Sequence, residues 1–425
     1  MIVAPVAVVA GRWLMWGVPA ALFLVAFFHR VAPGVIAKDL MTTFEMSGTV
    51  VGLLSATYFY AYAGLMVPAG VCIDAFGVRR MVTIGGAVMG LGAMAMGAAE
   101  GHLLLFAGRL LVGAGATTTF VGALKIAAVW FPPSQFGTLS AVTATVGVLG
   151  SLVATAPLAA LVSLAGWRGA LWLVGLLTVA CAVLCVAVVR DRPPHAAASE
   201  QPSSGLADVL GGTFQVVRNR HTWPPFLAFF CLYTTMGNLM LWVIPFLRDV
   251  YGLSMTRAAF YATATSTALL LAAPLTGYLS DAVFRRRKAP YTILTAGLGL
   301  VWVAFVATLG ALPLGALYAI FFAMGLFGGA FVLTWPIGRE VNPPHLAGVA
   351  VAVVNLGGFL GAAITQGPLG AVLDARWAGA MEAGARVYPL DAYRAAFAVC
   401  ALFVVGALLL SLLLRETRGR NMYAA

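Results

Sequence analysis

Three positively charged side chains lie inside long apolar stretches of this 425-residue chain: Arg30 in the stretch 13–37, and Arg109 and Lys125 in 103–130. A cation in an apolar environment is costly, so each should face a partner or a water-filled cavity. All 14 aspartate and glutamate residues fall at the ends of apolar stretches or between them. We therefore expect no acidic partner for these cations in the apolar interior, where an anionic ligand would stabilise them.

His29 precedes Arg30 and is the one histidine well inside an apolar stretch. An imidazole titrates near neutral pH, so His29 is the natural candidate for a proton carrier where no carboxylate is available. The alternative is a hydrogen-bonded histidine that stays neutral beside the guanidinium of Arg30.

The composition indicates an integral membrane protein. The chain is 62% hydrophobic and 9% charged, with a mean hydropathy of +0.97, which is not typical of a water-soluble protein of this length. Runs of about 20 apolar residues can cross a bilayer as helices. Twelve such runs are found, near 13–37, 48–72, 81–99, 103–130, 138–162, 169–190, 224–248, 256–281, 291–310, 313–336, 346–372 and 392–414. We predict an all-α membrane protein with twelve transmembrane helices.

The predicted spans contain no catalytic nucleophile, metal-ligand cluster or catalytic carboxylate, so we expect neither an enzyme nor a metal or cofactor site. The five cysteines all fall in or at the ends of apolar runs and imply no disulfide framework.

Basic residues lie mainly on one side of the predicted membrane. With a cytoplasmic N-terminus, that side receives most of the 25 lysines and arginines, including Arg79, Arg80 and the run 285–288. Cytoplasmic loops are enriched in such residues, so we expect both termini in the cytoplasm. The compact loops favour a bacterial inner membrane. The net charge of +11 largely reflects this asymmetry, so we expect membrane lipid rather than nucleic acid as a partner. We also expect the protein to function as a monomer.

The two halves of the chain repeat one another. Pro132-Pro133 recurs as Pro343-Pro344, and two glycines that follow recur at the same offset. Two parallel six-helix repeats suit a transporter that holds its solute at their interface near the bilayer midplane. The predicted division is an N-terminal six-helix bundle at 1–190, a cytoplasmic linker at 191–223 and a C-terminal six-helix bundle at 224–425, the two bundles being pseudo-symmetric.

A second repeat carries charged residues between spans. The segment Gly70-Val-Cys-Ile-Asp74-Ala-Phe-Gly77-Val-Arg79-Arg80 is matched by Gly277-Tyr-Leu-Ser-Asp281-Ala-Val-Phe284-Arg285, and Arg109-Leu-Leu-Val-Gly113-Ala-Gly115 lies on the fourth span. These elements resemble the signature motifs of the major facilitator superfamily. The resemblance covers essentially the whole chain and implies a transporter that works by alternating access.

The resemblance implies gating roles for Gly70, Asp74, Gly77, Arg79, Arg80, Arg109, Gly277, Asp281 and Arg285. Asp74 can cap a helix N-terminus and pair with a nearby guanidinium, while Gly70 and Gly77 permit close helix approach and a tight turn. The alternative is that these charges only anchor the loop. Phe284 stands where the second glycine would be, so we expect a weaker latch in the second half. We expect Arg109, near the outer end of its span, to act in structure or gating rather than in selectivity.

Finer features are similar to the anion:cation symporter branch, which carries small organic anions. They include the first-span Arg30 followed by Val31, Trp130-Phe131-Pro132 at the end of the fourth span, and Trp242-Val-Ile-Pro245 in the seventh. We expect substrate contacts from Arg30, Lys125, Tyr62, Asn238, Trp242 and Asn355. Lys125 can instead extend to the headgroups, the asparagines can bond neighbouring helices, and the tyrosine can serve packing.

We therefore expect proton-coupled uptake of a small carboxylate-bearing solute, such as a sugar acid, a monocarboxylate or an amino acid, with His29 as the coupling residue. Importing a monovalent anion against an inside-negative potential costs about 2.3 kcal/mol per 100 mV, so an importer needs a co-transported cation or an exchanged anion. An exporter of amphipathic compounds is the alternative within transport, although Ala156-Pro157 lacks the Gly-Pro pattern of many exporters. A non-transporting membrane receptor is the alternative from another class.

Overall fold

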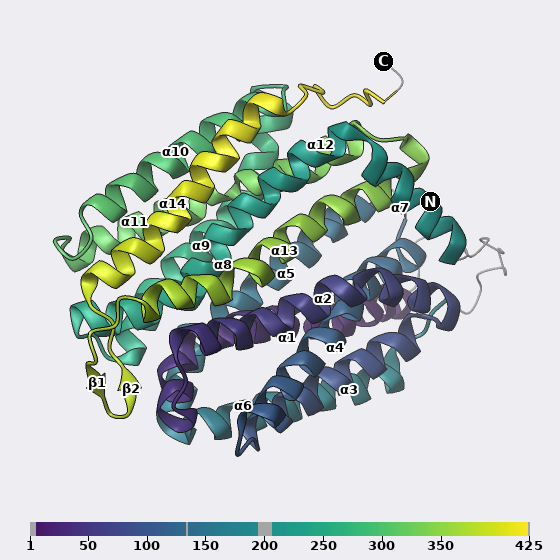
Figure 1. The fold of residues 1–425 in the computed structure, drawn as a ribbon. Coiled ribbons are helices and arrows are strands. Elements are labelled where there is room, and N and C mark those ends of the chain that lie inside the picture. Colours follow the sequence, from purple (N-terminus) through teal and green to yellow (C-terminus); the bar gives the residue numbers. More distant parts are fainter. Residues whose placement is uncertain (1–5, 133–134, 194–205, 424–425) are drawn as a thin grey trace. The chain divides into compact units, whose positions relative to one another are not determined.

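A computed structural model of the chain describes residues 6–132, 135–193 and 206–423 (Figure 1). Twelve helices in this part are long and apolar enough to cross a membrane, which confirms the predicted number of spans. The longer helices are α1 (Val6–Phe44), α2 (Gly48–Phe76), α3 (Val78–Gly97), α4 (His102–Trp130), α5 (Phe136–Val153), α6 (Ala156–Val188), α7 (Leu206–Arg218), α8 (Trp223–Tyr251), α9 (Met255–Tyr278), α10 (Lys288–Ala307), α11 (Leu314–Gly328), α13 (Ala347–Asp374) and α14 (Leu390–Leu413). The shorter elements are η2 (Arg220–Thr222), η3 (Leu279–Val283), η4 (Gly329–Leu333), α12 (Thr334–Glu340), η5 (Pro344–Leu346), β1 (Met381–Glu382) and β2 (Ala385–Arg386).

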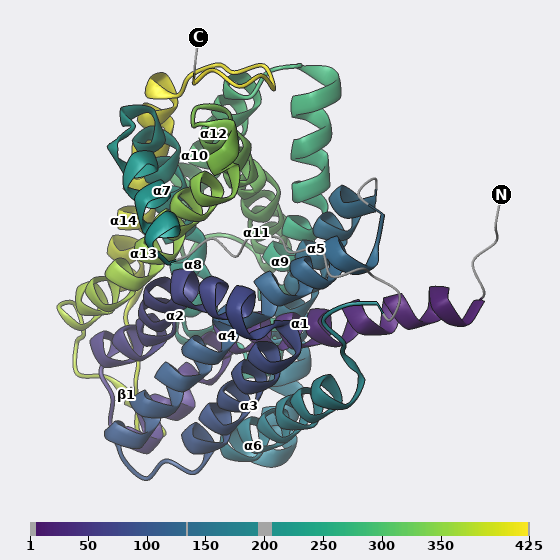
Figure 2. The same ribbon diagram turned by 90° about the vertical axis from the view of Figure 1, so that its right-hand side faces the viewer.

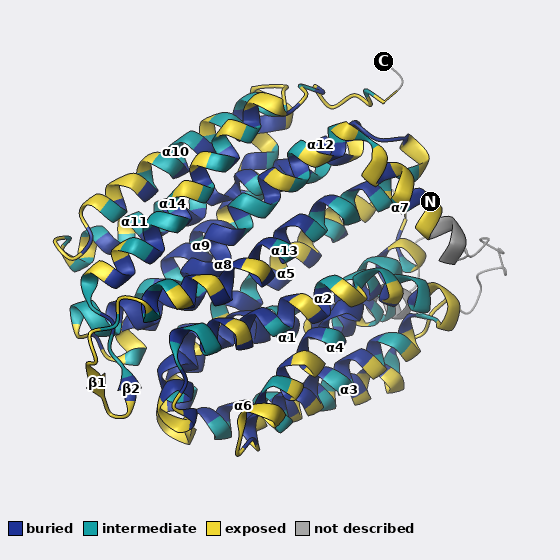
Figure 3. Cartoon of the chain, viewed as in Figure 1, coloured by how far each residue is buried: buried dark blue, intermediate teal, exposed yellow. Residues whose placement is uncertain are grey.

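Exposed residues lie on many of these helices (Figure 3), and they include large apolar side chains. Leu103, Leu164 and Leu300 are 86%, 87% and 74% exposed. Lipid tails are as apolar as leucine, so such faces are favourable in a bilayer. The exposed surface therefore agrees with a chain that spans a membrane many times.

The fifth predicted span, 138–162, is interrupted in the structure. Helix α5 ends at Val153 and α6 begins at Ala156, just before Pro157. A proline ring clashes with the carbonyl four residues earlier and lacks an N–H donor, so a helix breaks at this point. A second break lies inside α6 at Gly166, where φ is 69° and ψ is 166°. That turn separates the predicted fifth and sixth spans.

The structure divides into two compact units. The first comprises Met1–Arg30, Tyr60–Ala154 and Ala160–Gly205, and the second comprises Val31–Phe59, Thr155–Ala159 and Leu206–Ala425. In the first unit, α3 and α4 lie side by side (Figure 2). A β-carbon at Gly115 would lie 2.2 Å from the Gly85 carbonyl oxygen, so the glycines of these helices allow their backbones to touch.

The second unit joins parts of α1 and α2 to helices from the C-terminal half of the chain. A β-carbon at Gly34 of α1 would lie 2.3 Å from the Met240 carbonyl oxygen of α8, and one at Gly52 of α2 would lie 2.2 Å from the Gln366 carbonyl oxygen of α13. The first two helices therefore contact α8 and α13 backbone to backbone. The residue boundaries of the two predicted bundles stay a prediction, since the compact units divide α1 and α2 internally.

Two elements were not predicted. The stretch 191–223, expected to be a hydrophilic linker, contains the helix α7. Between α13 and α14, β1 and β2 form a short antiparallel hairpin in which Met381 pairs with Arg386.

Candidate functional site

Arg30 of α1 is held by two aromatic rings of the first unit. Its guanidinium carbon lies 4.0 Å from the ring centre of Phe27 and 5.7 Å from that of Tyr62 on α2. The Arg30 residue is only 8% exposed. Cation–π attraction is strengthened in such a desolvated setting. The structure thus brings Arg30 together with Tyr62, one of the other expected substrate residues.

Arg109 of α4 contacts α1 one residue before Arg30. Its Nη1 donates a hydrogen bond of 2.6 Å to the His29 carbonyl oxygen, and Arg109 is 1% exposed. The His29 side chain is also buried, and its Nε2 has no hydrogen-bond partner among the described residues. Arg109 therefore fixes the backbone that carries both His29 and Arg30.

Lys125 has a carboxylate partner, Asp74. The expectation that the interior cations lack such a partner is therefore wrong for this residue. Its Nζ lies 2.5 Å from Oδ1 of Asp74, and it also donates to the Ile73 carbonyl oxygen at 3.2 Å. Asp74 ends the apolar part of α2, and Lys125 lies on α4 within reach of it. Both side chains are partly exposed, at 33% for Lys125 and 47% for Asp74. We call these two residues the loop-motif pair.

In the loop after α2, several contacts differ from those that we expected from its motif. Gly77 has a φ of 87°, so it makes the expected tight turn. A carboxylate does cap the start of α3, but it belongs to Asp191: the backbone N–H of Arg79 donates to its Oδ1 at 2.8 Å. The Arg79 side chain donates to the Val186 carbonyl oxygen, and Arg80 is exposed. A β-carbon at Gly70 would meet no atom of the described residues within 4 Å, so Gly70 makes no close helix approach among them.

The repeated loop in the C-terminal half has its own set of contacts. Asp281 forms an ion pair with Arg287 rather than with Arg285, and Arg287 also pairs with Glu340 at 3.2 Å. Arg285 has a φ of 50°, so the left-handed turn falls on a non-glycine residue one position after Phe284. A β-carbon at Gly277 would meet no atom within 4 Å.

The remaining expected substrate residues lie on α8 and α13. Asn238 is fully buried and its Nδ2 donates to the Thr365 hydroxyl oxygen at 2.9 Å, which links the two helices. Trp242 is fully buried too, and its ring meets that of Tyr388 edge-on at 6.5 Å. Asn355 is half-buried on α13. Their substrate roles stay a prediction.

A buried ion pair that we did not predict joins α1 to α8. Lys38 Nζ lies 2.7 Å from Asp249 Oδ2, and the two side chains are 6% and 3% exposed. The same Asp249 oxygen accepts hydrogen bonds from the Tyr393 hydroxyl at 2.8 Å and from the Tyr388 backbone N–H at 3.1 Å. Lys38 also donates to the Arg386 carbonyl oxygen. These extra hydrogen bonds are what a desolvated ion pair requires.

Asp374, at the end of α13, extends this network to α2. Its carboxylate accepts from the backbone N–H groups of Gly48 at 2.9 Å and Thr49 at 2.8 Å, and so caps the start of α2. Arg386 and the Tyr388 hydroxyl also donate to Asp374. Burial, reinforced by the Asp374 carboxylate, raises the pKa of the Tyr388 hydroxyl, which therefore stays a donor. We call Lys38, Asp249, Asp374, Arg386 and Tyr388 the outer cluster, after the side of the membrane on which the sequence predicts them.

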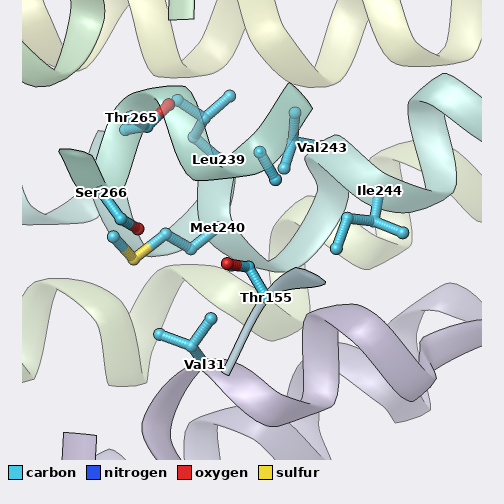
Figure 4. A pocket seen from close by; sticks show the side chains of 9 residues that line it. Val31, Thr155, Leu239, Met240, Val243, Ile244, Thr265 and Ser266 are labelled. Carbon is cyan, nitrogen blue, oxygen red and sulfur yellow. The ribbon is translucent and has the colours of Figure 1, made fainter. Parts of the chain in front are cut away.

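A small pocket lies within the second unit (Figure 4). Its lining combines apolar side chains with three hydroxyl groups, and consists of Val31, Thr155, Leu239, Met240, Val243, Ile244, Ala262, Thr265 and Ser266. The Thr265 hydroxyl donates to the Phe321 carbonyl oxygen. None of these described lining residues is ionisable, so they supply polar contacts but no charge for an anion.

Twelve apolar helices among the described residues, in a chain whose two halves repeat, are the architecture of a multi-pass membrane protein of the transporter type. A family model described as Major Facilitator Superfamily matches residues 20–366. The chain belongs to the major facilitator superfamily, whose members are transporters and not enzymes.

Several transporters and a membrane sensor are similar to this chain in sequence. The chain is 22% identical to the probable galactarate/D-glucarate transporter GudP of Bacillus subtilis, over 85% of this chain and 86% of that one. It is 22% identical to the probable sulfoacetate transporter SauU of Cupriavidus necator, over 68% of this chain and 70% of that one. It is also 23% identical to the membrane sensor protein UhpC of Salmonella typhimurium, over 83% and 82%. The first two are named for small organic anions, as expected for the branch that the sequence resembles.

Among solved structures, a bacterial homologue of the human lysosomal transporter Spinster superposes with a TM-score of 0.80. The match has 16% sequence identity and covers 96% of this chain and 97% of the other. It confirms the fold of the superfamily.

Proposed function

We propose that this transporter takes up a small organic anion and that Arg30 binds its carboxylate. The observation that carries the proposal is the position of Arg30: a permanently charged guanidinium in a membrane span, buried and oriented by Phe27 and Tyr62. A guanidinium presents donors in a planar fork that matches a carboxylate or sulfonate. The names of the relatives GudP and SauU support an anion that carries such groups.

Arg109 and His29 contribute to this site without contacting the substrate in this proposal. The hydrogen bond from Arg109 to the His29 carbonyl oxygen holds the backbone at Arg30, which keeps the guanidinium in one orientation. We propose His29 as the proton-coupling residue, because an inward anion flux needs a compensating charge and an imidazole can carry a proton near neutral pH.

We further propose that the outer cluster closes one side of the transporter during alternating access. Its bonds link α1 and α2 to α8, α13 and the hairpin. Helices from the two repeats must separate on each side in turn, so these bonds form in one state and break in the other. The expected gating residues of the two loops act in the same cycle.

The binding proposal is tested by thermal unfolding of the purified protein with galactarate, sulfoacetate and the uncharged galactitol. A ligand that binds only the folded state stabilises it by RT ln(1 + [L]/Kd), or about 2.7 kcal/mol at a concentration of 100 Kd. We expect stabilisation by at least one anion and none by galactitol. Arg30→Gln should abolish the effect.

Arg12→Gln is the matched control. Arg12 lies on the same helix, and its guanidinium also stacks on an aromatic ring, that of Phe131, at 5.0 Å. The anion should stabilise this variant as it does the parent protein. Equal stabilisation of the Arg30→Gln protein would overturn the proposed site.

The similarity to UhpC favours a second candidate function, in which solute binding is sensed without transport. Both functions predict anion binding. Uptake into proteoliposomes separates them, because a sensor would bind the anion without accumulating it.

A further inference from the structure

Helix α7 stands in the sequence between the two repeated halves of the chain, and one of its faces packs within the second unit. A β-carbon at Gly212 would lie 2.9 Å from Cδ2 of Leu346, and Val216, one turn later, is fully buried. This face therefore packs against the beginning of α13. Figure 1 shows α7 running across the direction of α8 and α13 rather than along it.

Helix α7 also carries exposed residues (Figure 3), and three of them on the opposite face are apolar. Leu210, Phe214 and Val217 are 55%, 67% and 37% exposed. Their spacing of four and three residues places them on one side of a helix. A stripe of this kind beside charged residues is typical of helices that lie in a membrane interface.

The C-terminal end of α7 is bonded to the residues that begin the next membrane span. The Thr222 hydroxyl donates to the Val216 carbonyl oxygen at 2.8 Å, and Nε1 of Trp223 donates to the Val217 carbonyl oxygen at 3.0 Å. That span runs over Arg220–Tyr251. Trp223 is itself 42% exposed, and tryptophan is enriched at the boundary between membrane and water. The apolar stripe thus continues directly to an exposed aromatic residue at the start of a membrane span.

Positive charge accompanies the stripe. Arg218 ends α7 and Arg220 follows two residues later, and both are exposed. Basic side chains at the edge of a membrane attract anionic headgroups. The charge and the continuity with α8 select a lipid surface over another protein as the occupant of this face.

We propose that α7 is a lipid-binding helix. The stripe Leu210/Phe214/Val217 inserts into the boundary between headgroups and acyl chains, and Arg218 and Arg220 bind anionic phospholipid headgroups. Asn219, the residue after α7, donates from Nδ2 to the Val341 carbonyl oxygen at 2.8 Å and to Oδ1 of Asn342 at 2.9 Å. Lipid bound to α7 therefore also holds the loop between α12 and α13.

The insertion is tested with a nitroxide label at position 214, in a full-length cysteine-free protein in bilayer nanodiscs of equal parts phosphatidylcholine and phosphatidylglycerol. Oxygen concentrates in lipid and a nickel chelate in water, so the ratio of their collision rates with the label reports its environment. We expect this ratio to be several-fold higher at 214 than at the neighbouring Gln215, which is exposed and polar. Equal access of the nickel chelate to both sites would overturn insertion, and so would a 214 label shielded from both reagents, which would mean that protein covers the stripe.

The headgroup contact is tested by thermal unfolding of the unlabelled protein in nanodiscs of phosphatidylcholine alone and of the mixture. The anionic mixture should raise the unfolding temperature of the parent protein, and the double variant Arg218→Gln/Arg220→Gln should lose that rise. Arg257→Gln is the control, because Arg257 is an exposed residue near the start of α9, away from α7 in the chain. A rise that persists in the double variant, or one that is lost equally in the control, would contradict headgroup binding by α7.

Discussion

The outer cluster and the loop-motif pair each contain a lysine bonded to an aspartate, but the two pairs differ in burial. Lys38 and Asp249 are 6% and 3% exposed, whereas Lys125 and Asp74 are 33% and 47% exposed. Exposed pairs contribute little to stability because water and salt screen them. Removing one partner of a buried pair lowers the stability of the protein strongly, because the other charge is left desolvated. The loop-motif pair, whose aspartate belongs to the motif of the superfamily, therefore contributes less to stability than the Lys38–Asp249 pair of the outer cluster.

The two pairs also differ in what they connect. Asp74 and Lys125 join α2 to α4, which both belong to the first half of the chain. Lys38 and Asp249 join α1 to α8, and Asp374 joins α13 to α2. In the alternating-access cycle that we propose, the two repeats move against each other, and bonds of the second kind break while those of the first kind stay.

The largest effect is expected for Asp249→Asn. The substitution leaves the Lys38 ammonium buried without its counter-charge, which should lower the free energy of unfolding by about 3–5 kcal/mol. Equilibrium unfolding in mixed micelles measures this loss.

A second substitution checks the cause. Lys38→Met combined with Asp249→Asn removes the orphaned charge and keeps an oxygen that can accept from Tyr393, so it should recover most of the loss. A double variant as unstable as the single one would show that the charge pair is not what stabilises this contact.

A smaller effect is expected for Gly52→Ala. The added β-carbon would lie 2.2 Å from the Gln366 carbonyl oxygen, so α2 and α13 must move apart. Overpacking of this kind typically costs about 1–3 kcal/mol, measurable by the same unfolding experiment. Gly64→Ala is the control on α2, since a β-carbon there would meet no atom within 4 Å. Equal loss in both variants would show that helix contact at Gly52 is unimportant.

The smallest effect is expected for Asp74→Asn. Both members of the loop-motif pair are partly exposed, and such pairs contribute about 1 kcal/mol or less. Unfolding at low and high salt measures the difference in the free energy of unfolding between parent and variant, and we expect this difference to become smaller at high salt, because salt screens an exposed pair. A loss as large as that of Asp249→Asn would remove the distinction between the two regions.

The fold was accessible from the sequence because each span is a long apolar run and because the halves repeat. The same logic located Arg30, since a cation in an apolar run is conspicuous. The carboxylate partners of Lys125 and Lys38 could not be predicted from the sequence. They lie at the ends of spans far away in the chain, and only helix packing brings each of them to its lysine. The cap from Asp191 was hidden for the same reason: its residue belongs to another span end, and no local pattern marks it.

Helix α7 shows another limit. Its stretch was expected to be a hydrophilic linker, because residues 190–223 contain several prolines and four arginines between two apolar runs. A run of 13 residues is too short for a span, and a search for spans passes over it.

Uptake into proteoliposomes tests most directly whether Arg30 binds a transported anion. The anion that stabilises the purified protein is supplied outside in radiolabelled form, with the lumen more alkaline, and accumulation is followed for the parent, Arg30→Gln, Arg30→Lys and Arg12→Gln proteins. We expect accumulation by the parent and by Arg12→Gln, a loss of at least about tenfold in Arg30→Gln, as removal of about 1.4 kcal/mol or more of binding would give, and partial uptake by Arg30→Lys, which keeps the charge but not the fork. Uptake by Arg30→Gln at the rate of the parent protein would contradict the account.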